Sequence, residues 1–226
     1  MVDDQAIDID ELLEIYDQAR HDLKIHMEGV IGFLSQHPDL TRDNIIHSTK
    51  SRLKDREHLR EKLARKIEAG REISKENLLH QITDLAGVRV LHLYQKDFTE
   101  IDRVIRRRVA AGDWCLGERP KAYTWDPEAV EFFGQFDLEI EEKPTFYTSV
   151  HYLIKPREDS PYSCEVQVRT LFEEIWGEVD HQLNYPKPTE SVACLEQIKV
   201  LAKVVGSGSR LLDAIQTVRE LEEQAE

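Results

Sequence analysis

Residues 143–170 read KPTFYTSVHYLIKPREDSPYSCEVQVRT and contain two stretches of alternating polar and apolar residues, joined by a segment rich in Pro, Ser, Asp and Glu. Alternation with a period of two is typical of β-strands that bury one face. The polar faces carry Tyr147, Ser149 and His151 in the first stretch and Glu165, Gln167 and Arg169 in the second. The pattern predicts two neighbouring strands that each present a row of chemically capable side chains.

Helices are expected on the N-terminal side of these strands. Apolar residues at three- and four-residue steps predict one long amphipathic helix from Ile9 to about Leu34. A second helix is expected from about Ser51 to Ala69, ending at Gly70. Apolar and β-branched residues that follow Gly87 predict a buried strand over residues 88–93.

The order of the elements indicates the class of fold. The other segments are a helix over 96–112, a loop over 112–127, a short helix over 128–136, a short strand over 137–142, a helix ending before Pro186, and one or two amphipathic helices over 189–226 that break at GSGS (206–209). We therefore expect an α/β (α+β) fold with a mixed, largely antiparallel central sheet of about five strands flanked by helices. The expected organisation is one domain over 1–226, with an N-terminal helix in 1–36, a catalytic core over 51–187 and C-terminal helices over 189–226.

Composition excludes several classes of protein. The 226 residues, 40% hydrophobic and 33% charged, suffice for one sizeable core. No stretch approaches the roughly 18 consecutive apolar residues of a membrane-spanning helix, and the acidic start MVDDQAIDIDE does not resemble a signal peptide. A cytoplasmic location is therefore expected. The net charge of -14 disfavours non-specific attraction to nucleic acid.

The cysteines are few and widely spaced. Cys115, Cys164 and Cys194 are odd in number, which favours reduced thiols over a disulfide framework or a zinc site.

A cationic stripe is expected on the helix predicted after Ser51. At about 100° per residue, Lys54, His58, Lys62 and Arg65 fall within roughly 80° of one another. The apolar residues of the same segment occupy the adjacent sector, so the stripe would border the packed face. Such a stripe suits a polyphosphate ligand. The alternative is a solvated charged helix stabilised by i,i+4 pairs.

Two carboxylates are candidate metal ligands. Asp84 stands three residues before Gly87, at the start of a predicted strand, where it could bind the Mg²⁺ of a nucleotide or simply cap a turn. Glu165 lies on the polar face of its own strand. Two carboxylates that converge on a metal among cations are typical of a phosphoryl-transfer site. The alternative for each strand is the solvent-facing side of an antiparallel sheet.

Four motifs in sequence order resemble the RelA/SpoT-type alarmone synthetase domain, and within it the small single-domain synthetases. They are SRLKDREHLREKL, similar to the ATP-binding helix; DLAGVRV, similar to the metal-binding segment; KPTFYTSVHY, similar to the acceptor loop and strand; and EVQVRT followed by EVDHQLNYP, similar to the signature strand and helix. The resemblance covers roughly Ser51 to Lys187. It implies an enzyme that binds ATP and Mg²⁺ and transfers the β,γ-pyrophosphate of ATP to the 3′-hydroxyl of GDP or GTP, releasing AMP and making (p)ppGpp.

The resemblance also implies roles for individual residues. Arg52 and Arg89 would flank the adenine of ATP, and Lys54, His58, Lys62 and Arg65 would contact its phosphates. Asp84 would bind Mg²⁺, and Glu165 would complete the metal site or accept the proton of the attacking hydroxyl. The acceptor nucleotide would be contacted by Lys143, Tyr147, Ser149 and His151, with Tyr147 stacking on its base, and the pocket would be lined or braced by Gln167, Arg169, His181 and Asn184.

The acceptor loop differs from the family's usual Gly-Tyr-Arg-Ser, which is Phe146-Tyr147-Thr148-Ser149 in this chain. The preceding segment, GQFDLEIEEKP (134–144), is acidic where the family is commonly basic. Two alternatives therefore stay open. One is the same chemistry on an adenosine nucleotide or on the 3′ end of tRNA, although the net charge disfavours tRNA. The other is a degenerate nucleotide-binding domain, against which the retained Asp84 and Glu165 argue.

Self-association is expected through the terminal helices. The apolar stripe over residues 189–226 exceeds what a small sheet domain need bury. The predicted partners are therefore ATP, a nucleotide acceptor and further copies of the chain.

Overall fold

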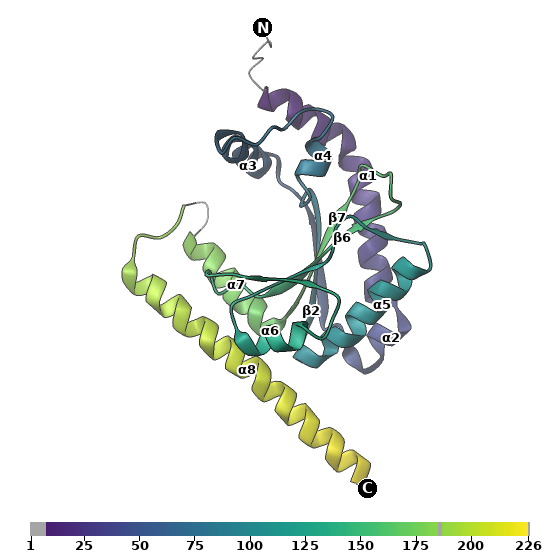
Figure 1. The fold of residues 1–226 in the computed structure, drawn as a ribbon, viewed down its shortest axis with the longest axis vertical. Helices are drawn as coiled ribbons and strands as arrows, with labels where there is room; N and C mark the ends of the chain where they lie inside the picture. Colours follow the sequence, from purple (N-terminus) through teal and green to yellow (C-terminus); the bar gives the residue numbers. More distant parts are fainter. Residues whose placement is uncertain (1–7, 185–186, 226) are drawn as a thin grey trace.

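The computed structural model describes residues 8–184 and 187–225, and these form one mixed sheet covered by helices (Figure 1). The strands are β1 (Ser48–Leu53), β2 (Ala86–His92), β3 (Cys115–Leu116), β4 (Lys121–Thr124), β5 (Glu139–Glu142), β6 (Ser149–Lys155) and β7 (Cys164–Thr170). The helices are α1 (Ile9–Gln36), α2 (Pro38–Thr41), α3 (Arg56–Glu68), α4 (Leu78–Gln81), α5 (Phe98–Ala110), α6 (Pro127–Phe133), α7 (Leu171–Asn184) and α8 (Val192–Ala225), with short 3-10 turns at η1 (Arg42–Asn44) and η2 (Gln95–Asp97).

The sheet has the strand order β1-β2-β7-β6-β4-β5, and β3 pairs with β6. The pairs β2–β7 and β4–β5 are parallel, and the other pairs are antiparallel. Helices α1 and α5 lie on one side of the sheet, whereas α7 lies on the other side with α8 packed behind it (Figure 1). The predicted class of fold is confirmed, with seven strands in place of about five.

The apolar faces of the central strands form the main core with α1. Val88, Val150 and Val166 are fully buried and belong to the same cluster as the α1 residues Leu13 and Tyr16. The antiparallel pairing of β6 with β7 confirms the two strands predicted from the alternating pattern. Their apolar residues face this core, so their polar residues project from the opposite side of the sheet.

The helix predicted over Ser51 to Ala69 starts too early. Residues 48–53 form the edge strand β1, and α3 begins only at Arg56, where the Asp55 side chain accepts hydrogen bonds from the amides of Glu57 and His58. Strand β1 is polar except for Leu53 and has no buried residue, so it lacks the alternation that identifies a half-buried strand. Pairing with β2, rather than local propensity, makes it a strand.

Two further strands fall inside the segment expected to be a loop, residues 112–127. Both β3 and β4 are short and pair with β6. The short helix predicted over 128–136 corresponds to α6, and the strand predicted over 137–142 corresponds to β5. The helix expected to stop before Pro186 is α7, whose last described residue is Asn184, and residues 185–186 lie outside the part of the chain that the structure describes.

The expected break at GSGS does not occur, because α8 continues through residues 206–209. The small residues allow α8 to pack closely on its neighbours. A Cβ atom at Gly208 would lie 2.9 Å from the ring of Phe172 on α7. Ser209 is 4% exposed and its hydroxyl lies 3.4 Å from that of Thr170. These residues therefore serve the helix contact and do not interrupt the helix.

Replacing Gly208 by Val is expected to lower the free energy of unfolding by about 1–3 kcal/mol, because the added methyl groups would overlap the Phe172 ring. Urea denaturation measures the change. Gly32→Val on α1 is the matched control, since a Cβ at Gly32 meets no atom within 4 Å. Equal stability of the two variants would contradict close packing of α8 on α7.

In the described residues no helix is long and apolar enough to cross a membrane. The thiols of Cys115, Cys164 and Cys194 are free, and Cys164 is buried.

Candidate functional site

The polar side of the sheet aligns the predicted site residues in rows. The strand registers give one row of Arg52, Gly87 and Glu165, and a second row of Lys50, Arg89, Gln167, His151 and Lys121. Because Gly87 has no side chain, the first row is open between Arg52 and Glu165. Residues far apart in the sequence therefore face one space.

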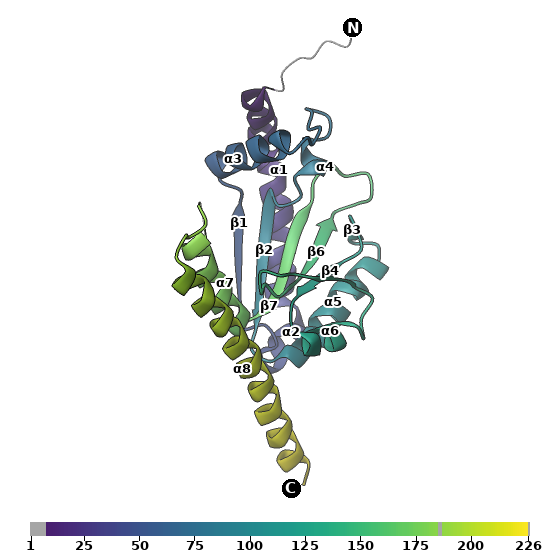
Figure 2. The same ribbon diagram turned by 60° about the vertical axis from the view of Figure 1, so that its left-hand side comes forward.

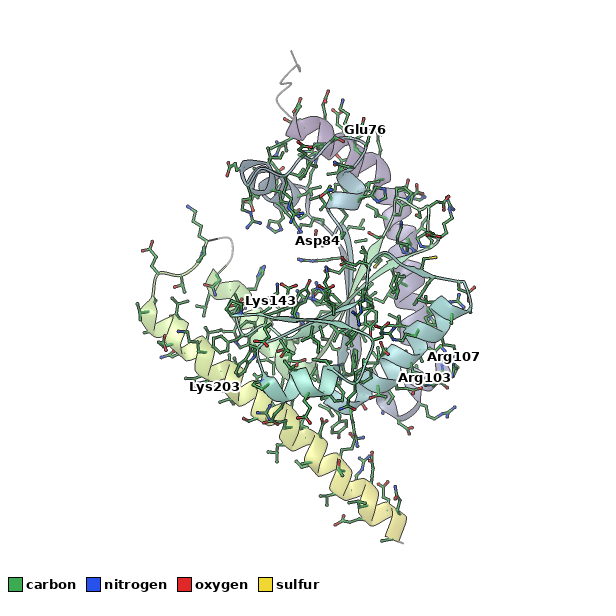
Figure 3. All side chains as sticks on the ribbon, viewed as in Figure 1. Glu76, Asp84, Arg103, Arg107, Lys143 and Lys203 are labelled. Carbon is green, nitrogen blue, oxygen red and sulfur yellow. The ribbon has the colours of Figure 1, made fainter. Side chains whose placement is uncertain are left out.

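A cavity of about 300 Å³ lies over these rows. Its walls include six of the residues singled out from the sequence, namely Arg52, Asp84, Arg89, Glu165, Gln167 and His181, and they also include Lys50, Gly87 and Glu178. The walls thus come from β1, β2, β7, α7 and the segment before β2. Figure 3 shows Asp84 just below α3, at the end of the sheet.

Asp84 is held by two lysines. The Nζ atoms of Lys54 and Lys62 each lie 2.7 Å from one of its carboxylate oxygens. Burial would raise the pKa of Asp84, but the charges of Lys62 and Lys54 outweigh that effect and keep the pKa below its ordinary value. Lys54 lies just before α3 and not on it, so the cationic stripe is made by a loop residue and a helix residue that meet at one carboxylate.

Glu165 projects from β7 between hydrogen-bond donors. The Nδ1 atom of His151 lies 3.3 Å from one oxygen, and the amide of Gln167 donates to the other at 2.6 Å. Burial, and to a smaller extent the charge of Asp84, raises the pKa of Glu165, but the contacts with His151 and Gln167 hold the pKa below its ordinary value. The Tyr147 hydroxyl lies 2.9 Å from Nε2 of His151. Glu165 is therefore ionised near neutral pH.

Arg89 reaches from β2 to the carboxylates of α7. Its Nη1 atom lies 3.2 Å from Glu174 and 2.6 Å from Glu178. Glu174 also pairs with Lys50 at 2.8 Å and with Arg169, which is only 3% exposed. This network joins α7 to three strands. Burial in this network is compatible with Arg169 bracing the pocket, and its role stays a prediction.

The other residues assigned to ATP lie farther out. Arg52, on β1, is exposed although it lines the cavity. His58 and Arg65 are exposed on α3, and neither is among the residues that line the cavity. Their contacts with phosphate stay predictions.

Of three residues assigned to the acceptor, two are partly exposed and one is buried. Tyr147 lies 6.3 Å from the ring of Tyr123, with its hydroxyl directed to His151. Lys143 lies 4.5 Å above the ring of Tyr123 and pairs with Glu141. Ser149 is 1% exposed, which places it out of reach of a ligand in this conformation. Its expected contact with the acceptor stays a prediction.

The two remaining pocket residues lie toward the end of α7. His181 lines the cavity. Asn184 donates to Asp180 at 2.8 Å and accepts the amide hydrogen of Thr189 at 3.3 Å, so it ties α7 to the segment before α8.

A second cavity, of about 380 Å³, lies on the other side of Glu165. Three cations line it, Lys66, Arg71 and Lys121, together with His80, His151, Tyr123 and the carboxylates of Glu118 and Glu165. Burial lowers the pKa of Lys66, and the neighbouring cations Lys62 and Arg71 lower it further. Sequence reasoning missed this site, because β4 was taken for a loop. The alternation of Lys121, Ala122 and Tyr123 was the signal that could have placed Lys121 on the polar face.

The sequence also matches the family model described as the region found in RelA / SpoT proteins, over residues 51–190. The match includes Asp84, Glu165 and most of both cavities.

The chain belongs to the RelA/SpoT family.

Among relatives of this RelA/SpoT chain is the GTP pyrophosphokinase YwaC of Bacillus subtilis (strain 168), which is 24% identical over 189 residues, covering 78% of this chain and 80% of YwaC. A GTP pyrophosphokinase family protein from Streptococcus pneumoniae has the same fold, with a TM-score of 0.62, 22% identity and coverage of 98% and 97%. Small alarmone synthetase 1 from Bacillus subtilis, solved with its product pppGpp, has a TM-score of 0.57, 21% identity and coverage of 92% and 94%. The expected resemblance is confirmed.

The carboxylates of the RelA/SpoT site fit a magnesium ion. Over residues 8–184 and 187–225, no group of three or more His, Cys, Asp and Glu could hold a metal without help from a substrate. Mg²⁺ does not need such a group, because it usually takes one or two protein carboxylates together with substrate phosphates and water. Asp84 and Glu165 line the same cavity and are the residues that would hold such an ion.

Proposed function

We propose that this chain is a Mg²⁺-dependent pyrophosphokinase that transfers the β,γ-pyrophosphate of ATP to the 3′-hydroxyl of GDP or GTP, making (p)ppGpp and releasing AMP. One observation carries the proposal. Asp84 and Glu165 line a single cavity, with Lys54 and Lys62 on Asp84 and two arginines in the same walls. Carboxylates for a metal beside cations for phosphates are the requirements of phosphoryl transfer.

The chain's own residues would position the donor. Lys54 and Lys62 both pair with Asp84 in this structure, and the phosphates of ATP would take over as their partners. Arg52 and Arg89 offer guanidinium planes for a purine. A bound Mg²⁺ would supply charge neutralisation on the transferred group. Glu165 would complete the metal site or accept the proton from the acceptor hydroxyl.

The second cavity supports a nucleotide acceptor with 5′-phosphates. Lys66, Arg71 and Lys121 line it, and it meets the first cavity at Glu165. A phosphate group in this cavity would pair with these three cations. They would take the place of basic residues that the acidic segment 134–144 lacks. The glutamates of β5 are exposed and none of them lines this cavity, so they do not argue against an anionic acceptor.

The altered acceptor loop has an unusual backbone conformation at Phe146. Phe146 has a φ of +63°, a conformation that costs a non-glycine residue about 1–2 kcal/mol and that Gly adopts freely. Thr148, in the place of the family's usual Arg, is 7% exposed and its hydroxyl lies 3.1 Å from that of Thr124. Phe146 therefore adopts a backbone conformation that suits a glycine, and Thr148 supplies no cation. This difference is the reason to test an adenosine nucleotide and tRNA as acceptors.

The acceptor is tested by incubating the purified chain with Mg²⁺ and γ-labelled ATP against GDP, GTP, ADP, AMP and bulk tRNA, with chromatographic separation of the products. Label on a guanosine nucleotide is the expected result. Label on an adenosine nucleotide or tRNA would select the altered acceptor. Absence of transfer to every acceptor would contradict the proposal and favour a nucleotide-binding module without turnover.

We further propose a cytoplasmic protein that self-associates through α8. Large apolar residues on α8 are exposed, and the C-terminal half of the helix projects beyond the sheet (Figure 2). They are Val200, Val204, Leu211, Ile215, Val218 and Leu221, each between 55% and 62% exposed. Their spacing of three, four and seven residues forms one stripe, which is typical of a helix that packs on another helix.

Light scattering is expected to give a mass above the 26.3 kDa of one chain. Charging the stripe with Leu211→Glu and Val218→Glu together is expected to give the mass of a monomer, because it would bury carboxylates in an apolar contact. Glu223→Gln, on another face of the same helix, should leave the mass unchanged. A monomeric wild-type chain would contradict self-association.

A further inference from the structure

The orientation of Arg89 depends on a pair of carboxylates from α7. Glu174 and Glu178 are four residues apart, so they lie on one face of the helix, one turn from each other. Both approach the same atom, Nη1 of Arg89, at 3.2 Å and 2.6 Å. These two contacts leave the Nη2 and Nε edge and the flat face of the guanidinium for a ligand in the cavity.

The two carboxylates differ in what else they do. The Glu174 side chain is 7% exposed and is shared among Arg89, Lys50 and Arg169, so its place is set by the buried network. The Glu178 side chain is 48% exposed, lines the cavity and makes the shorter contact with Arg89. Its removal would leave the buried network intact. A flexible guanidinium with one remaining contact could then rotate away from the cavity.

The negative charge of Glu178 is unfavourable for the binding of a polyphosphate. A carboxylate in the wall of a cavity that accepts a polyphosphate repels that ligand. The carboxylate is compatible with ATP binding if it improves the geometry of Arg89 by more than it costs in repulsion. Preorganising a side chain in its binding orientation improves affinity, because less ordering remains to be done when the ligand arrives.

We propose that Glu178 is a positioning residue for the nucleotide donor, which holds the guanidinium of Arg89 in the plane that receives the purine ring of ATP. The inference rests on the proposed function, which places Arg89 beside the adenine. Glu178 does not touch the reacting phosphate in this account. Its effect should appear in donor binding, and neither the chemical step nor the acceptor should be affected.

The test is the variant Glu178→Gln in the full chain, which keeps the shape of the side chain and removes its charge. The variant is titrated calorimetrically with α,β-methylene ATP, a donor analogue that cannot release its pyrophosphate. We expect the Kd to rise about 5- to 20-fold, which is the effect of losing one charge-assisted hydrogen bond. The KM for ATP should rise similarly, whereas kcat and the KM for GDP should change less than about twofold. Glu178→Asp should restore part of the affinity.

Glu196→Gln on α8 is the charge-matched control. Glu196 pairs with Lys199 on the surface, and the variant should bind the analogue as the wild type does. A Glu178→Gln variant that binds the analogue equally or more tightly would overturn the inference, because repulsion alone predicts that result. A wild-type chain that binds the analogue but transfers nothing would refute the proposed function. The comparison of analogue binding between the wild type and Glu178→Gln would still decide whether Glu178 positions Arg89. A wild-type chain that does not bind the analogue would refute both.

Discussion

Glu165→Gln is expected to slow pyrophosphoryl transfer at least about a hundredfold, which corresponds to about 3 kcal/mol in the barrier. The amide has the size of the carboxylate, and the pocket that holds Glu165 would still accept it. It carries no charge for a metal ion and cannot take a proton from the acceptor hydroxyl. Initial rates with saturating ATP and GDP measure the loss.

The control for Glu165→Gln is Glu139→Gln. Glu139 is exposed on β5 and is outside both cavities, so its variant should keep the wild-type rate. Thermal unfolding of both variants shows whether they fold equally well. A Glu165→Gln enzyme with more than about a tenth of the wild-type rate would remove Glu165 from the metal site and from proton transfer.

Glu174→Ala is expected to lower the free energy of unfolding by about 3–5 kcal/mol. Glu174 and Arg169 are 6% and 3% exposed, and removal of the carboxylate leaves a buried guanidinium without its ionic partner. The midpoint of urea unfolding should fall with no change in the slope. This loss exceeds that of an ordinary surface substitution.

The matched control removes a different partner of the same carboxylate. The Lys50 side chain is 57% exposed, so Lys50→Met should cost less than about 1 kcal/mol. The double variant Glu174→Met with Arg169→Met should recover much of the stability, because two well-packed apolar residues replace the buried pair. If Glu174→Ala cost less than about 1 kcal/mol, the network would not be the link between α7 and the sheet.

Part of the site could be predicted because the alternation of polar and apolar residues along a strand indicates which side of the sheet each side chain faces. The positions of Glu165, Gln167 and His151 follow from a period of two, and the structure brings these three side chains into contact. Asp84 was identifiable from its place before a Gly-led strand. Its pairing with Lys54 and Lys62 was not, because it depends on how α3 sits over the end of the sheet.

The missed features share a physical cause, which is that tertiary contacts decide them. Strand β1 has a largely polar sequence with no buried residue, and it is a strand because β2 pairs with it. Residues 206–209 would end an isolated helix, yet α8 continues because Gly208 gives α7 room to approach. Lys66 and Lys121 are 55 positions apart, and only the folded chain places both in one cavity. No local pattern contains such information.

Cleavage of ATP between its α- and β-phosphates distinguishes the proposed pyrophosphokinase from a kinase that transfers a single phosphoryl group. Parallel reactions of the wild-type chain with Mg²⁺, GDP and either α-labelled or γ-labelled ATP test it most directly. The proposed chemistry predicts the α-label in AMP and the γ-label on the guanosine product, in equal amounts. An α-label recovered in ADP would identify a single-phosphoryl kinase and would contradict the account.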